Sequence, residues 1–247
     1  MSEPRLRTVN KVQPPYRLGL FKRESIISIA GGIVYLLHTR NEARLEGPDW
    51  EKIFAESIGA EWKPSNIGLD DVQFGCCCWG AKTVKNRYPS TAKSVRLISG
   101  RNSLDYSYGK SDVRSLPPQS VGSDVIEIWN ERVSSVRERF AHVRTVVLLK
   151  SSDLSECALF EVDTVRFDPT LFDWTWNRRG NLEGRELKTK RHRFTWQPHG
   201  SQFTIIEDVP ANRVAFRIRL PGALSKDVVL GAIGFDDTWV EFIDAVR

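Results

Sequence analysis

Residues 69–86 read Leu-Asp-Asp-Val-Gln-Phe-Gly-Cys-Cys-Cys-Trp-Gly-Ala-Lys-Thr-Val-Lys-Asn, and this stretch predicts the centre of the fold. Two acids, Asp70 and Asp71, precede a short turn around Gly75, and an apolar run after the turn ends at Lys82. A turn between two such runs is typical of a β-hairpin. The hairpin would place a carboxylate on one strand and a lysine on its neighbour, which suits a divalent metal beside a phosphate. The alternative is a buried hairpin with incidental charges at its ends.

The two-residue period of a strand distinguishes the two acids. Val72 and Phe74 share one face of the first strand, and Asp71 and Gln73 share the other. If the apolar pair faces the core, Asp71 faces the site and Asp70 turns inward at the start of the strand. This pattern favours Asp71 as the working acid.

The same period selects a lysine on the second strand. Cys78, Gly80 and Lys82 share one face, whereas Lys85 lies on the opposite face and suits a surface role or a phosphate contact. The neighbouring cysteines Cys76, Cys77 and Cys78 are consecutive, and Cys157 is remote from them. They form neither a disulfide framework nor paired Cys-x-x-Cys units, so we expect them to be small buried side chains.

A helix is predicted just before the hairpin, at residues 47–58. Pro48 stands in its first turn and Gly59 follows its end, which is the usual asymmetry of helix termini. At about 100° per residue, Glu51 borders the apolar face of this helix and would reach a site at the sheet edge. Glu56 points well away from that face, so we expect it to be solvated.

The composition is that of a soluble globular protein with a mild basic excess. Of the 247 residues 40% are apolar and 27% are charged, and the net charge is +5. A basic excess of this size is a weak indication of a polyanionic partner. The N-terminus lacks a secretory pattern, and the longest apolar stretch, 26–37, is too short to span a bilayer. We therefore expect a cytoplasmic protein without membrane contact.

The remaining elements predict an α/β fold with one central mixed sheet flanked by helices and a β-rich, basic C-terminal part. We expect one domain over residues 1–247 with no linker, and an irregular arm over residues 1–20. Ser123 is a candidate N-cap for the long helix in the middle of the chain. Further helices are predicted at 24–38, 121–140 and 236–246, and strands at 95–98, 144–150, 157–162, 203–206 and 214–220.

Two polar, basic regions have the side chains that contact DNA. Arginine suits guanine and asparagine or glutamine suits adenine in the major groove, while cations bind the phosphates. The alternatives are a solvated loop in the first region and, in the second, a charged hairpin with Trp174, Trp176 and Trp196 in the core. The candidate DNA-binding residues are Arg101, Asn102, Ser103 and Tyr106 in the first region and Arg178, Arg179, Asn181, Arg185, Gln197, His199 and Gln202 in the second.

Several common enzyme classes lack their motifs in this sequence. We find no phosphate loop of the Gly-x-x-x-x-Gly-Lys type, no Gly-x-Gly-x-x-Gly turn and no Gly-x-Ser-x-Gly elbow. The four histidines show no metal-ligand spacing. We therefore expect no nucleotide cofactor.

The order of helix, acid-bearing strand, turn and lysine-bearing strand resembles the PD-(D/E)XK nucleases, and in particular a type II restriction endonuclease. The matched core covers about residues 45–150, and the basic aromatic part, about 165–220, would suit target recognition. Asp71 matches the first acid of the motif and Lys82 matches its lysine. The second acid should stand at position 80, where this chain has Gly80. Some members of the superfamily recruit an acid from the neighbouring helix, and Glu51 is then the best candidate.

The resemblance implies Mg²⁺-dependent, sequence-specific hydrolysis of double-stranded DNA within a restriction–modification system. Asp71 and Glu51 would hold the Mg²⁺, and Lys82 would orient the attacking water or stabilise charge on the phosphorus centre. A homodimer would let a two-fold enzyme cut both strands of a palindrome. The alternative is a non-catalytic DNA-binding protein on a degenerate nuclease fold, which the glycine at position 80 would favour.

Overall fold

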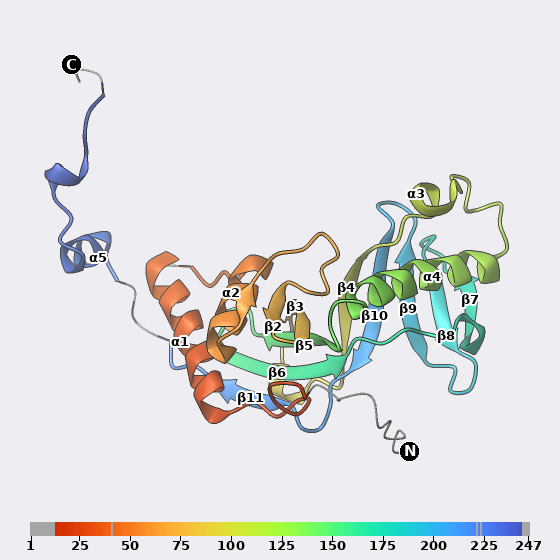
Figure 1. The fold of residues 1–247 in the computed structure, drawn as a ribbon, viewed down its shortest axis with the longest axis horizontal. Coiled ribbons are helices and arrows are strands. Elements are labelled where there is room, and N and C mark those ends of the chain that lie inside the picture. The colour runs from red at the N-terminus through yellow and green to blue at the C-terminus, as the bar shows by residue number, and fades with distance from the viewer. Residues whose placement is uncertain (1–12, 41, 221, 223, 244–247) are drawn as a thin grey trace.

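The chain builds a mixed sheet and an antiparallel sheet, with helices on the outer face of the mixed sheet (Figure 1). The computed structural model describes residues 13–40, 42–220, 222 and 224–243. The α/β fold, the mixed sheet with flanking helices and the strand-rich C-terminal part are as predicted. The expectation of one sheet is wrong, because residues 94–101 form a strand that pairs in the second sheet.

The mixed sheet carries the predicted hairpin close to one edge. Its strands, in the order in which they pair, are β1 (Glu61–Trp62), β2 (Val72–Phe74), β3 (Cys77–Lys85), β5 (His142–Lys150), β6 (Glu156–Asp163) and β11 (Val214–Arg217). β3 and β5 are parallel, and the other neighbouring pairs are antiparallel. A parallel pair requires a long crossover, which here contains β4 (Ser94–Arg101) and α4 (Pro118–Arg137).

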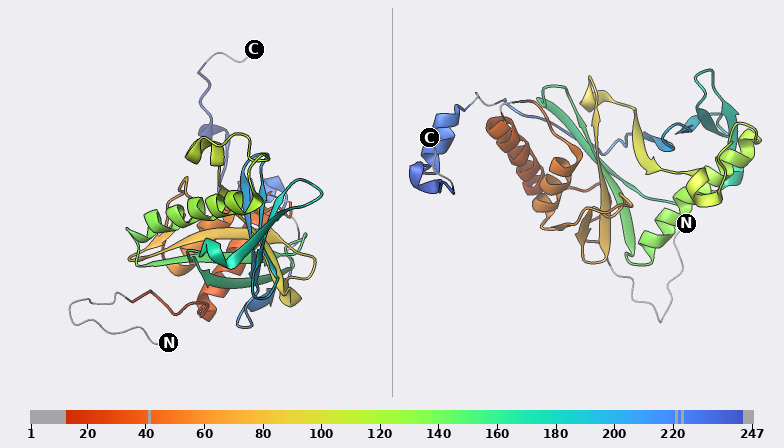
Figure 2. Two further views of the ribbon diagram at one scale, coloured as in Figure 1. Left: turned by 90° about the vertical axis from the view of Figure 1, so that its right-hand side faces the viewer. Right: turned by 90° about the horizontal axis from the view of Figure 1, so that it is seen from above.

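Two helices cover the face of the mixed sheet that points away from the second sheet (Figure 2). They are α1 (Arg23–Arg40) and α2 (Gly47–Ile58). α2 ends where Gly59 adopts a left-handed φ of 67°, as the sequence predicts. It buries Trp50 and Phe54, and the ring of Phe54 meets that of Trp79 on β3 edge-on at 5.7 Å. Burying a side chain of this size contributes about 1.5–3 kcal/mol, so this contact holds α2 beside the hairpin.

The antiparallel sheet packs against α4. Its strands, in the order in which they pair, are β4, β10 (Gln202–Asp208), β9 (His192–Gln197), β8 (Leu182–Glu186) and β7 (Phe172–Trp176). Trp174 on β7 lies between two glycines, Gly122 on α4 and Gly184 on β8. A Cβ at Gly122 would lie 2.1 Å from the Trp174 ring and one at Gly184 2.8 Å from it, so both positions require glycine. The tryptophans of the basic region therefore serve packing, since Trp174 and Trp196 are buried and Trp176 is partly buried.

The short elements of the second half occupy connections and the C-terminal end. They are α3 (Leu104–Tyr108), α5 (Lys226–Ala232) and the 3-10 turns η1 (Pro89–Thr91), η2 (Pro169–Leu171) and η3 (Asp237–Trp239). None of the helices in the described ranges is long and apolar enough to cross a membrane.

A buried ionic network ties the N-terminal segment to the mixed sheet. Glu161 of β6 accepts hydrogen bonds from the Tyr16 hydroxyl, from Trp79 Nε1 at 2.7 Å and from the Gly19 amide at 3.0 Å. Arg144 of β5 pairs with Glu161 at 3.4 Å. Residues 13–20 of the expected arm are thus irregular but anchored, and residues 1–12 lie outside the described residues.

Three predicted boundaries differ from the structure. α4 begins at Pro118 with Pro117 as its N-cap, so Ser123 is an interior residue and its predicted capping role is wrong. β11 ends at Arg217, short of the predicted 220. Instead of a closing helix at 236–246, the chain forms α5 and η3, where the Ser225 and Asp236 side chains cap the turns; residues 244–246 lie outside the described residues. Cys77, Cys78 and Cys157 are buried, as predicted, whereas Cys76, which was also expected to be buried, is only partly buried.

Candidate active site and nucleic-acid surface

Asp71 is held at the start of β2 in a nearly water-free position. Its side chain is 4% exposed, and its Oδ1 accepts a hydrogen bond from the Ser65 amide at 3.2 Å. Burial raises the pKa of Asp71 above its ordinary value, and the Glu51 carboxylate adds to the rise while Lys82 opposes it. An acid in this state gains stability from a nearby cation.

Lys82 lies in the middle of β3 on the face that points to the second sheet. Its Nζ donates to the backbone carbonyl of Gly68 at 3.1 Å. Burial lowers the pKa of Lys82, while the charges of Asp71 and Glu51 act in the opposite direction. The structure therefore brings the two motif residues predicted from the hairpin within electrostatic reach of each other.

Glu51 completes this group from α2. It is half-buried, and its Oε2 accepts a hydrogen bond from Trp62 Nε1 at 3.0 Å. Its charge acts on both Asp71 and Lys82. Glu56, on the same helix, is exposed, as the helical period predicts. Glu51 thus contacts β1 through Trp62 and acts on the hairpin residues through its charge.

Asp70 has a different set of partners from Asp71. It is buried, it receives a hydrogen bond from the Ser65 hydroxyl, and it pairs with Arg139 at 2.8 Å. Because Asp70 is already neutralised by Arg139, Asp71 is the acid that remains available beside Lys82.

The position of the second motif acid is closed by backbone. A Cβ on Gly80 would lie 2.8 Å from the Gly68 carbonyl oxygen and 3.1 Å from the Leu69 Cα. A carboxylate at position 80 therefore has no room unless residues 65–69, which we call the cover loop, move away. Within the described ranges no cluster of three or more His, Cys, Asp and Glu side chains is arranged to hold a metal ion.

Asp71 and Glu51 offer the type of ligand that magnesium takes. Mg²⁺ is commonly held by one or two carboxylates, with water and substrate phosphate as the other ligands. Among the described residues, Asp71 Oδ2 and Glu51 Oε1 accept no hydrogen bond, so each acid has one oxygen free. Burial is the main cause of the raised pKa of Asp71, the Lys82 charge opposes the rise, and the Glu51 charge adds to it.

Arg132 of α4 connects the cover loop to β4 and was not singled out by the sequence. It donates to the Ser99 carbonyl at 2.6 Å and also to the carbonyl of Ile67. Burial lowers the pKa of Arg132, and its charge helps to lower that of Lys82. In the sequence, Arg132 stands out only as a cation late in a helix, where it interacts favourably with the helix dipole. That signal does not indicate its contact with the cover loop.

The first set of predicted DNA-binding residues is only partly exposed. Arg101 ends β4 and is exposed, Ser103 caps α3 by accepting from the Tyr106 amide at 3.2 Å, and Tyr106 is 93% exposed. Asn102 is fully buried, and its amide donates to the Val125 carbonyl at 2.8 Å. Its predicted position in an exposed loop is wrong, because its side chain ties the β4–α3 corner to α4.

The second set gathers at one end of the antiparallel sheet, with one exception. Gln202 pairs across the strands with both Arg101 and Gln197, so the two predicted sets meet there. The β7–β8 turn lies at the same end, since Leu182 pairs with Trp196. This end carries Arg178, Arg179, Asn181, Gln197, His199 and Gln202. Arg185 lies farther along β8, where it pairs with Glu183 at 3.1 Å.

Comparison of this chain with protein-family models, with curated proteins and with solved structures found no match. The assignment of a function therefore rests on its own side chains. These are Asp71 and Lys82 at the hairpin, Glu51 on α2, and a set of polar side chains at the end of the second sheet. Of that set Arg178, Arg179 and His199 are exposed, and Asn181, Gln197 and Gln202 are partly buried.

Proposed function

We propose that this protein is a Mg²⁺-dependent, sequence-specific double-stranded DNA endonuclease of the PD-(D/E)XK type, similar to type II restriction enzymes. The observation that carries the proposal is that Asp71, Lys82 and Glu51, from two strands and one helix, lie within one another's electrostatic reach. The succession of α2, β2, the turn at Gly75 and β3 supports it, because it is the order of helix, acid-bearing strand, turn and lysine-bearing strand on which the resemblance rests. The enzyme would act in the cytoplasm as part of a restriction–modification system.

Each side chain of the site has a role in this chemistry. A magnesium ion, when bound, would stabilise the negative charge that builds on the phosphate during attack. Asp71 and Glu51 would hold it through their free oxygens, with Ser65 and Trp62 fixing the other oxygen of each acid. Lys82 would exchange the Gly68 carbonyl for a phosphate oxygen or the attacking water.

DNA recognition would take place at the end of the antiparallel sheet. Exposed Arg101, Arg178 and Arg179 supply charge for phosphates or guanine edges, and Gln197 and Gln202 are able to pair with adenine. Arg185 would contribute only to the general positive potential, since Glu183 already pairs with it. Asn102 is withdrawn from this set because it is buried.

The proposal is tested by incubating plasmids of varied sequence with the protein and Mg²⁺. We expect discrete fragments, and we expect Asp71→Asn, Lys82→Met and Glu51→Gln to reduce the cleavage rate at least about a hundredfold by removing charge stabilisation. Glu56→Gln is the matched control, since it removes an exposed carboxylate from the same helix. A lack of discrete fragments with all sequences and metals would refute the function. An Asp71→Asn protein that cuts like the parent would refute the site.

A second candidate is a DNA-binding protein without catalysis. The closed position at Gly80 favours it, because loss of a motif acid is a route by which a nuclease becomes inactive. This candidate predicts tight, salt-sensitive DNA binding with no cleavage in Mg²⁺, and absence of DNA binding at low salt would exclude it.

We also propose a homodimer, in which two copies face the two strands of a palindromic site. Residues 224–243 support it, because they leave the body beyond α1 and expose Trp239, Phe242 and Ile243 (Figure 1). The partner that suits this surface is a second copy. The segment carries Asp236, Asp237 and Glu241, and α1 begins with Arg23; Arg40 at the other end of α1 is already paired with Asp49 at 2.7 Å.

A further inference from the structure

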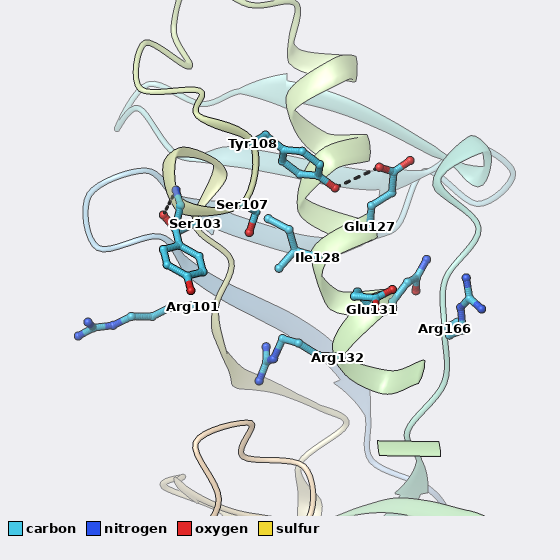
Figure 3. A pocket seen from close by; sticks show the side chains of 11 residues that line it. Arg101, Ser103, Ser107, Tyr108, Glu127, Ile128, Glu131, Arg132 and Arg166 are labelled. Atoms are coloured by element: carbon cyan, nitrogen blue, oxygen red, sulfur yellow. Dashed lines mark hydrogen bonds between the residues drawn. The ribbon is translucent and has the colours of Figure 1, made fainter. Parts of the chain in front are cut away.

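A pocket of about 770 Å³ lies between the β4–α3 corner and α4. Its size is within the range of small-molecule sites, about 300–1,000 Å³. Figure 3 shows Tyr108 and Glu127 at one end, Arg132 toward the other, and Arg101 and Arg166 on opposite flanks. Of these side chains, Arg132 also holds the cover loop and Arg101 belongs to the proposed DNA surface, whereas Tyr108, Glu127 and Arg166 have no role in the site described above.

The walls of the pocket combine aromatic rings with carboxylates, and Tyr106, Tyr108, Glu127 and Glu131 are all exposed to solvent. Tyr108 donates a hydrogen bond to Glu127 Oε2 at 3.2 Å, and burial raises the pKa of Tyr108 to about 12, so its phenol stays protonated. Glu131, one helical turn after Glu127, accepts no hydrogen bond from any described residue. Tyr106 is 93% exposed, so one face of its ring is free for stacking. A carboxylate beside a free aromatic face suits a flat ligand that carries an amino group.

The positive and negative side chains of the pocket occupy different places: the exposed arginines lie at its rim and the carboxylates between them. Arg101 and Arg166 are exposed, and neither has an ion-pair partner among the described residues. Glu127 and Glu131 would repel a phosphate inside the pocket. The two arginines would instead bind phosphates at the rim, on either side of an uncharged part of the ligand that enters the pocket.

The pocket adjoins the proposed catalytic hairpin through the cover loop. Arg132, which lines the pocket, donates to the carbonyl of Ile67, and Lys82 donates to the carbonyl of the next residue, Gly68. One short loop thus contacts the pocket wall on one side and the lysine on the other.

We propose that this pocket takes one nucleotide extruded from DNA, with an amino-bearing base (cytosine, adenine or guanine) stacked on Tyr106 and donating to Glu131. The neighbouring phosphates would lie on Arg101 and Arg166. The inference rests on the proposed function, because it assigns the pocket to the DNA that the hairpin would cut. Enzymes that read an extruded base use stacking on aromatic side chains together with hydrogen bonds to the base edge, and this pocket offers both.

The test measures the affinity for short duplexes in Ca²⁺ at fixed salt by fluorescence anisotropy. One duplex is fully paired, and others carry a single unpaired cytosine, adenine, guanine or thymine. We expect the unpaired amino-bearing bases to improve affinity at least about tenfold over the paired duplex, and thymine to improve it less. Tyr106→Ala and Glu131→Gln should each abolish that preference. The matched controls are Tyr88→Ala and Glu138→Gln, which change exposed side chains outside the pocket and should retain it.

The outcomes separate this inference from the proposed function. Plasmid cleavage without any preference for an unpaired base would overturn the inference and leave the nuclease standing, whereas a lack of DNA binding would overturn both. Titration with dCMP alone distinguishes the source of the nucleotide. If free dCMP bound as tightly as the unpaired duplex, with the same loss in Glu131→Gln, the pocket would be a free-nucleotide site and the assignment to DNA would be wrong.

Discussion

Gly80 has a packing role that is independent of catalysis. Its Cα faces the backbone of the cover loop, and a Cβ there would lie 2.8 Å from the Gly68 oxygen and 3.1 Å from the Leu69 Cα. Because both contacts are backbone atoms, Gly80→Ala should lower the free energy of unfolding by about 1–3 kcal/mol in urea denaturation. The control is Gly31→Ala on α1, where a Cβ would meet nothing within 4 Å. It should raise the free energy of unfolding by about 0.5–1 kcal/mol.

The two variants together decide whether the cover loop is rigid. If Gly80→Ala were as stable as the parent, the loop would give way readily, and a Gly80→Glu protein would then be able to carry the acid that the motif expects. If the destabilisation appears, this chain cannot use position 80 for metal binding while the loop is closed.

Tyr16 provides a pH-dependent contribution to stability. Burial, with the nearby Glu161 carboxylate, raises the pKa of Tyr16 well above its ordinary value of 10.0. The folded state therefore keeps the proton at pH values where the unfolded state loses it. The contribution is complete below about pH 10 and is lost as the pH rises above it.

The comparison that measures this contribution is the parent against Tyr16→Phe. Near pH 8 the variant should be less stable by about 1.5–3 kcal/mol, because the buried, charged Glu161 carboxylate loses the hydrogen bond that the Tyr16 hydroxyl donates to it. In urea denaturation at pH 8 and pH 11, that difference should shrink at the higher pH. A difference that is the same at both values would contradict the raised pKa. Tyr108, whose pKa is also raised, is present in both proteins, so its contribution to the pH dependence cancels in the difference between them.

At the scale of elements, the strand and helix periods predicted which side chains of one element share a face. The two-residue period of β2 and β3 placed Asp71 and Lys82 on the side of the site, and the helical period placed Glu51 toward it and Glu56 away from it. Burial alone does not mark one face of these strands, because β3 is buried on both faces from Cys77 to Ala81 and, in β2, Val72 is buried while Phe74 is exposed. The expectation that Val72 and Phe74 both face the core is therefore wrong at Phe74. The function of the site stays a prediction.

The features that could not be predicted depend on contacts between distant parts of the chain. Asn102 looks like a loop residue, but its carbonyl accepts from Trp196 and its amide donates to Val125, on elements far along the sequence. β4 follows β3 directly, yet it pairs with β10, and no local pattern encodes that register. Ser123 suits an N-cap, but Pro118 had already started the helix five residues earlier. In each case tertiary packing decided among locally acceptable alternatives.

At the scale of the whole molecule, the C-terminal segment determines how two copies would assemble. Residues 224–243 extend beyond α1, away from the antiparallel sheet (Figure 1). α1 itself exposes Ile27 and Tyr35, 58% and 66% respectively, so two apolar surfaces lie close together at this side of the molecule. If each copy placed its segment on α1 of the other, the same contact would be made twice around a two-fold axis. The end of the antiparallel sheet that is proposed to bind DNA would then stay free.

The assembly is tested by replacing two aromatic side chains of the segment, Trp239→Ser with Phe242→Ser. They are 60% and 70% exposed in the single chain, and burial of each in a dimer would contribute about 1.5–3 kcal/mol. Sedimentation velocity should show a dimer for the parent and a monomer for the variant, and Tyr88→Ser, which removes an exposed aromatic elsewhere, should remain dimeric. With supercoiled plasmid, the parent should release linear DNA, whereas the monomeric variant should accumulate nicked circles because a single site cuts one strand at a time. A parent that sediments as a monomer at every concentration, or a double variant that still dimerises, would show that this segment does not join two copies.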